Sequence, residues 1–146
     1  MVSSKSDDLG KLLLRVTVGA LILLHGIAKM RHGLGDVADA MARAHLPHEV
    51  GYLVYLGEVV GPLMMIAGWW TRPAALVVFI NMVVALLLGH LHEMFTLTTH
   101  GGLLLETQWL MLTGALAVAL SGAGRYSVDG NRGQVQVSGI ASRKRA

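Results

Sequence analysis

Four predominantly apolar stretches follow one another along the chain, separated by short polar segments. They run over Leu9–Met30, Val50–Trp70, Ala74–Leu91 and Leu103–Ser121. A helix needs about 20 such residues to cross the hydrocarbon core of a bilayer. The pattern therefore predicts an all-α membrane protein, an antiparallel four-helix transmembrane bundle that occupies residues 1–125.

The polar joints between the stretches indicate how the helices are connected. Trp70-Thr71-Arg72-Pro73 is short, and Pro73 disfavours helical backbone at Arg72 while it can begin the next helix. This joint predicts a tight turn, which makes the second and third helices antiparallel neighbours. The first stretch has no small-residue cleavage site near its end, so we expect a retained helix rather than a signal peptide.

Composition supports the same class of protein. Of the 146 residues, 53% are hydrophobic and 14% are charged, whereas soluble domains carry about 25% charged residues. The net charge of +3 does not indicate nucleic acid as a partner, because the basic residues flank apolar stretches or lie in one tail. The chain has no Cys, and therefore no thiolate nucleophile or iron–sulfur ligand of its own. Any redox work needs a bound cofactor or a partner.

The distribution of Lys and Arg predicts the orientation of the helices. Nine of these residues fall on the side of the two termini and three fall on the other side. Because positively charged short loops stay in the cytoplasm, we expect a multi-pass protein with cytoplasmic N- and C-termini. Residues 126–146 are polar and end in Arg143-Lys144-Arg145, which predicts a flexible basic tail that contacts anionic headgroups of the membrane lipids.

Glu58 is the residue of the predicted bundle whose placement in the bilayer costs the most free energy. It lies about nine residues, or roughly 13 Å, from the outer end of the second stretch, well inside the hydrocarbon. Pro62 cannot donate to the Glu58 carbonyl, which leaves a spare acceptor beside the carboxylate. Gly57 and Gly61 allow another helix to approach closely. Two interpretations stay open: an ion pair with Arg15 or with a histidine of the first helix, or a functional pocket.

Other polar residues are placed on helix faces by a rotation of about 100° per residue. In the first stretch one stripe, expected to face the bundle, consists of Arg15, Gly19, Ile22, Gly26 and Lys29, and His25 lies at its edge. In the third stretch Asn81 begins a face that ends at His92. In the fourth stretch Glu106 heads a polar face, with Gln108 nearby. Ionisable groups at such depths mark functional sites in membrane proteins.

The histidines invite a metal hypothesis that the spacing does not support. His90-x-His92-Glu93 contains common metal ligands. However, no His-x-x-x-His or similarly tight ligand pattern occurs in the chain. We therefore assign no metal site from the sequence, and metal handling stays an alternative function.

Several motifs together resemble the DoxX family of small bacterial membrane proteins. They begin with Leu12-Leu13-Leu14-Arg15-Val16 and cover about residues 9–130. The others are His25-Gly26, Lys29, Gly57-Glu58-Val59-Val60-Gly61, Gly68, Thr71-Arg72, Gly101-Gly102, Glu106 and Gly122-Ala123-Gly124-Arg125-Tyr126-Ser127-Val128-Asp129. The resemblance implies a four-helix fold in the bacterial inner membrane. The family is similar to the membrane subunit of thiosulfate:quinone oxidoreductases, and some members are linked to redox-stress complexes with soluble partners.

The resemblance implies a quinone-linked oxidoreductase component that works with a soluble or membrane redox partner. A quinol loses protons as it loses electrons, so this hypothesis needs carboxylates or imidazoles beside the ring. The candidates for proton transfer are Glu58, His25 and Glu106. The candidates for quinone binding are Arg15, Lys29, Asn81 and Gln108. Three alternatives stay open: a non-enzymatic scaffold or small-molecule binder, a small transporter that works as a homo-oligomer, and the metal-handling protein.

Overall fold

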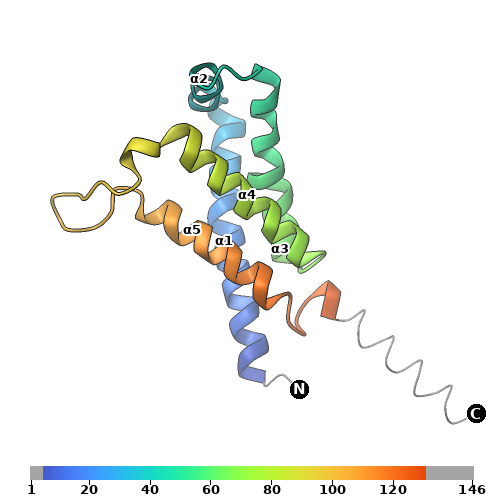
Figure 1. Cartoon of the computed structure of the whole chain (residues 1–146). Coiled ribbons are helices and arrows are strands. Elements are labelled where there is room, and N and C mark those ends of the chain that lie inside the picture. Colours follow the sequence, from blue (N-terminus) through green and yellow to red (C-terminus); the bar gives the residue numbers. More distant parts are fainter. Residues whose placement is uncertain (1–4, 131–146) are drawn as a thin grey trace, which may run out of the picture.

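The computed structural model describes residues 5–130 of the chain (Figure 1). In this range the protein is helical, and its elements are α1 (Lys5–His32), α2 (Gly35–Arg43), η1 (His48–Leu53), η2 (Leu56–Val60), α3 (Gly61–Ala67), α4 (Thr71–Gly89), η3 (Leu91–Glu93) and α5 (Glu106–Ser121). No strand is assigned within these residues, where the extended backbone is limited to a single bridge between Leu97 and Leu103.

Three segments are long and apolar enough to cross a membrane. They are Lys5–His32, His48–Ala67 and Thr71–Gly89, which agree with the first three predicted stretches to within a few residues. The fourth predicted helix forms as α5, but its 16 residues extend for only about 24 Å, less than the roughly 30 Å of a bilayer core. The structure therefore gives three candidate spans and a fourth, shorter helix packed against them.

The second span is not a uniform α-helix. It begins as the 3₁₀-helix η1, passes through the π-helical turn η2 and ends as α3. In the π turn the Gly61 N–H donates to the carbonyl of Leu56, five residues earlier. Pro62 follows directly and has no N–H to donate, which favours a widened turn here. The irregular backbone contains Glu58, the residue that is expected to cost the most free energy inside a bilayer.

Glycines bring the three spans close together. A methyl group on Gly26 of α1 would collide with the carbonyl oxygen of Glu58, and one on Gly57 would collide with the Asn81 side chain of α4. A methyl group on Gly61 would lie 2.7 Å from Val78. These contacts confirm the predicted close approach at Gly57 and Gly61. They surround a core that includes Ile22, Met65, Ala75, Val78 and Ala115, all without exposed surface.

The predicted first outer loop contains a helix that the hydropathy pattern did not predict. Helix α2 crosses the upper end of the molecule in Figure 1, beside the start of the second span. Its buried residues are Ala40 and Met41. Gly51 of η1 packs against it, because a methyl group there would lie 3.1 Å from Val37 and 3.6 Å from Met41.

The start of α1, the turn between α3 and α4, and residues 122–130 meet at one end of the molecule, here called the terminal end. The backbone N–H of Asp129 donates to the Gly68 carbonyl at 2.9 Å, and the N–H of Arg125 donates to the Asp8 carboxylate at 3.1 Å. The first residues of the expected flexible tail, 126–130, are thus bound to the helices. The rest of that tail, 131–146, lies outside the described residues.

Candidate functional site

The carboxylate of Glu58 is buried between two spans. Its residue is 2% exposed and belongs to the π turn η2. One carboxylate oxygen, Oε1, accepts a hydrogen bond from Lys29 Nζ of α1 at 2.5 Å. The other oxygen, Oε2, is buried without a hydrogen-bond partner among the described residues. An unpaired buried oxygen on a charged group is costly, so this carboxylate is not explained by packing alone.

Asn81 brings a second unpaired polar atom to the same region. Its side chain lies against the backbone of Gly57, the residue before Glu58. The amide nitrogen Nδ2 is buried, and no residue within 5–130 forms a hydrogen bond with it. Glu58 Oε2 can accept a hydrogen bond, or donate one when the carboxyl is protonated, whereas Asn81 Nδ2 can only donate. Two buried polar atoms with unused hydrogen-bonding capacity therefore lie on η2 and α4, which are in contact at Gly57 and Asn81.

Lys29 connects this region to the surface. It belongs to the last turn of α1, about 4.5 Å along the axis from the end of the helix. Its side chain is 29% exposed, whereas that of Glu58 is 3% exposed. The ammonium group is therefore both the partner of the buried carboxylate and its nearest described link to water.

Arg15 lies in the same stripe of α1 as Lys29 but serves a different site. Fourteen residues separate the two, or about 21 Å along the helix. The Arg15 guanidinium donates from Nη1 to the carbonyls of Met65 at 2.8 Å and Ile66 at 2.6 Å, and from Nη2 to the carbonyl of Tyr126. It thereby satisfies carbonyls at the C-terminal end of α3, which have no partner within their own helix.

The structure separates the predicted site residues into groups. Lys29 pairs with Glu58, so the predicted ion-pair partners Arg15 and His25 are wrong, and Asn81 lies against Gly57, the residue before Glu58. His25 is exposed at the edge of the stripe, and its Nδ1 lies 2.9 Å from the Leu21 carbonyl of its own helix. Glu106 is exposed at the first residue of α5, and Gln108 is half-buried on the same helix. Among residues 5–130, no hydrogen bond or ion pair joins these three to Glu58, Lys29 or Asn81.

The histidines do not form a recognisable metal centre in the part of the chain that the structure describes. Among residues 5–130 no group of three His, Asp or Glu side chains is close enough to hold a metal ion. His90 Nδ1 lies 3.2 Å from Glu93 Oε2 in an exposed i,i+3 pair. This contact is a local one between two residues of the same turn, and each supplies a partner for the other.

Sequence comparisons agree on the kind of protein. The sequence profile of the family described as DoxX matches residues 10–91, more than half of the chain. The chain is also similar to a Bacillus subtilis (strain 168) protein named "Putative oxidoreductase CatD", with 25% identity over 126 residues, 86% of this chain and 89% of that protein. No solved structure matches significantly. The apolar spans and the match to this family together identify the chain as a membrane protein.

Proposed function

Because this chain belongs to the DoxX family, we propose that it is the membrane component of a quinone-linked oxidoreductase, located in the bacterial inner membrane. The observation that carries the proposal is the buried carboxylate of Glu58, which has one oxygen paired with Lys29 and the other unpaired. The name of the Bacillus subtilis relative supports redox chemistry in general.

The reaction requires groups of this kind. A quinone that becomes a quinol takes up two electrons and two protons, one proton on each ring oxygen. Glu58 in its protonated form can donate a proton, and it can recover one from water by way of Lys29. Lys29 Nζ and Asn81 Nδ2 can each donate a hydrogen bond to a quinone oxygen. The residues therefore supply the protons and the binding groups for this step.

The electrons must come from elsewhere. Without Cys, the chain has no thiol or iron–sulfur ligand of its own. We propose that a soluble or membrane-bound partner carries the redox cofactor and delivers both electrons to the quinone. This chain would then dock that partner and hold the quinone in the membrane.

The test replaces the ionisable group while keeping its shape. Glu58→Gln should abolish reduction of a short-tailed quinone by native membranes or by the copurified complex. Glu49→Gln is the matched control, because it makes the same change at an exposed position of the same span. Binding of the quinone to the purified protein in nanodiscs separates loss of chemistry from loss of binding. A folded Glu58→Gln protein with normal activity would falsify this role.

A non-enzymatic scaffold is the second candidate, since the 2.5 Å contact between Lys29 and Glu58 also joins α1 to the second span. On that reading Glu58→Gln lowers the melting temperature, and partner binding returns when stability is restored by other means. On the redox proposal the variant stays folded and inactive. Measurements of the melting curve and of activity on the same preparation separate the two.

We also propose that α5 crosses the membrane, so that both termini are cytoplasmic. The terminal end joins the start of α1 to residues 122–130, which supports termini on one side. Reporter fusions at about residues 40 and 97 should read external, and fusions near residue 72 and at the C-terminus should read cytoplasmic. A C-terminal reporter on the external side contradicts the crossing by α5.

A further inference from the structure

At the terminal end the acidic side chains are turned inward. Asp8 is 2% exposed and accepts a hydrogen bond from the Arg125 backbone. Asp129 accepts from the N–H of Trp70 at 3.1 Å, from the N–H of Thr71 at 3.0 Å and from the Thr71 hydroxyl at 3.1 Å. The Asp129 carboxylate thus satisfies the first N–H groups of α4, where negative charge is favoured. Asp8 and Asp129 are therefore held in place by hydrogen bonds to the backbone.

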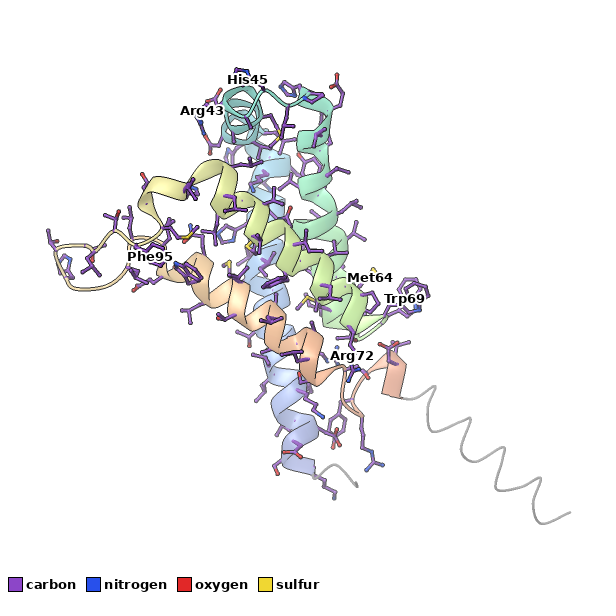
Figure 2. All side chains as sticks on the ribbon, viewed as in Figure 1. Arg43, His45, Met64, Trp69, Arg72 and Phe95 are labelled. Carbon is purple, nitrogen blue, oxygen red and sulfur yellow. The ribbon has the colours of Figure 1, made fainter. Side chains whose placement is uncertain are left out.

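Arg15 is buried, but three other basic side chains and three aromatic side chains at the same end are exposed. Lys5, Arg72 and Arg125 are exposed, against a single exposed acid, Asp7. Three large aromatic side chains are also exposed: Trp69 at 45%, Trp70 at 60% and Tyr126 at 53%. Figure 2 shows Trp69 on the turn between α3 and α4 and Arg72 near the start of α4, both away from α2. Exposed Trp and Tyr beside membrane spans are typical of the headgroup region.

The opposite end, which carries α2, has the reverse character. Away from the terminal end, the exposed acids are Asp36, Asp39, Glu49, Glu93 and Glu106, and the exposed Lys and Arg residues are Arg31 and Arg43. Beyond the described residues the sequence continues from the terminal end with four more basic residues and no acidic ones over 131–146. The exposed charge is therefore mainly positive at the terminal end and mainly negative elsewhere. The inward placement of Asp8 and Asp129 increases this difference.

We propose that the terminal end is a binding surface for anionic phospholipid headgroups, with Arg72 and Arg125 as its cationic contacts and Trp69, Trp70 and Tyr126 as its interfacial anchors. Charge complementarity selects this ligand, because a negatively charged leaflet attracts basic groups that lie beside a span. The surface is independent of the Glu58 region and does not depend on the proposed redox activity.

The experiment measures lipid selectivity directly. The purified full-length protein is titrated with phosphatidylglycerol and with phosphatidylcholine of the same acyl chains, and bound lipids are counted by native mass spectrometry. The wild type should prefer phosphatidylglycerol, and the preference should weaken at high salt. Arg72→Gln with Arg125→Gln should reduce it by about fivefold per residue, the factor that corresponds to about 1 kcal/mol per basic side chain.

The matched control is Arg31→Gln with Arg43→Gln, which removes two exposed basic residues from the opposite end and should leave the preference unchanged. Because Arg72 also approaches the Leu120 carbonyl, Arg125→Gln and Lys5→Gln are measured singly as well. Equal affinity of the wild type for both lipids overturns the proposal, and so does an equal loss in the control. A preference that disappears only when Arg132, Arg143, Lys144 and Arg145 become Gln assigns the effect to the tail and also overturns it.

Discussion

Arg15 and Glu58 are both 2% exposed inside apolar spans, yet their surroundings differ. Arg15 donates to three backbone carbonyls from two separate segments of the chain, and only its Nε is unpaired. Glu58 has a single partner, Lys29. Its second oxygen is unpaired, as is the neighbouring Asn81 amide.

The comparison teaches that burial alone does not identify a working residue in a membrane protein. Hydrogen bonds to backbone carbonyls at the end of a helix are what a fold needs, and Arg15 supplies them. Buried polar atoms without a hydrogen-bond partner destabilise the fold and do not help to hold it together. Glu58 and Asn81 belong to the second kind, which is why the proposed function rests on them.

The largest expected effect is at Arg15. Arg15→Met removes the guanidinium donors for the carbonyls of Met65, Ile66 and Tyr126, and should destabilise the protein by several kcal/mol, because each hydrogen bond to a charged group contributes about 1.5–3 kcal/mol. The measurement is thermal or denaturant unfolding in detergent. Arg31→Met, an exposed change on the same helix, should stay within about 0.5 kcal/mol of the wild type. Equal stability of the two variants would show that the hydrogen bonds of Arg15 do not stabilise the fold.

A smaller effect is expected where the spans touch near Glu58. Gly57→Leu and Gly61→Leu insert side chains into contacts with Asn81 and Val78, and overpacking of this kind costs about 1–3 kcal/mol. Gly10→Leu is the control, because nothing lies within 4 Å of a methyl group at that position of α1. Melting curves in detergent that coincide for all three variants would show that the close approach between the spans is absent.

The smallest effect, and the sharpest test of the comparison, is at Asn81. Asn81→Leu keeps the approximate shape and removes the unpaired amide, so stability should be unchanged or rise by about 1 kcal/mol. Quinone binding in nanodiscs should weaken, because one donor is lost. A clear loss of stability would show that the amide has a partner in the folded protein. Asn81 would then stabilise the fold, as Arg15 does.

Much of this architecture could be predicted from the sequence. Hydropathy located the three spans, because about 20 apolar residues in a row have few other uses. Helical periodicity placed Arg15, Gly19, Ile22 and Gly26 on one buried face, and the structure confirms it. The small residues at Gly57 and Gly61 predicted a close approach that the structure also shows.

Periodicity could not predict which charged residues would meet. A helix face tells which residues point inward, but the partner depends on how far one helix slides along the next. Glu58 therefore meets Lys29, although Arg15 and His25 were the expected partners. Helix α2 was missed because its apolar residues, Val37, Ala40 and Met41, form one short helical pattern inside a polar loop. Spacing of that kind is the signal that could have predicted it.

The contact between Arg15 and Tyr126 also orders events during biosynthesis. Ribosomes make Arg15 early, and one of its acceptors follows 111 residues later. Until that segment emerges, the first helix carries a guanidinium whose hydrogen bonds are incomplete, in a place where water is scarce. A chain that stops before Tyr126 keeps this defect permanently. The hydrogen bonding of the first helix made therefore depends on a residue that follows α5.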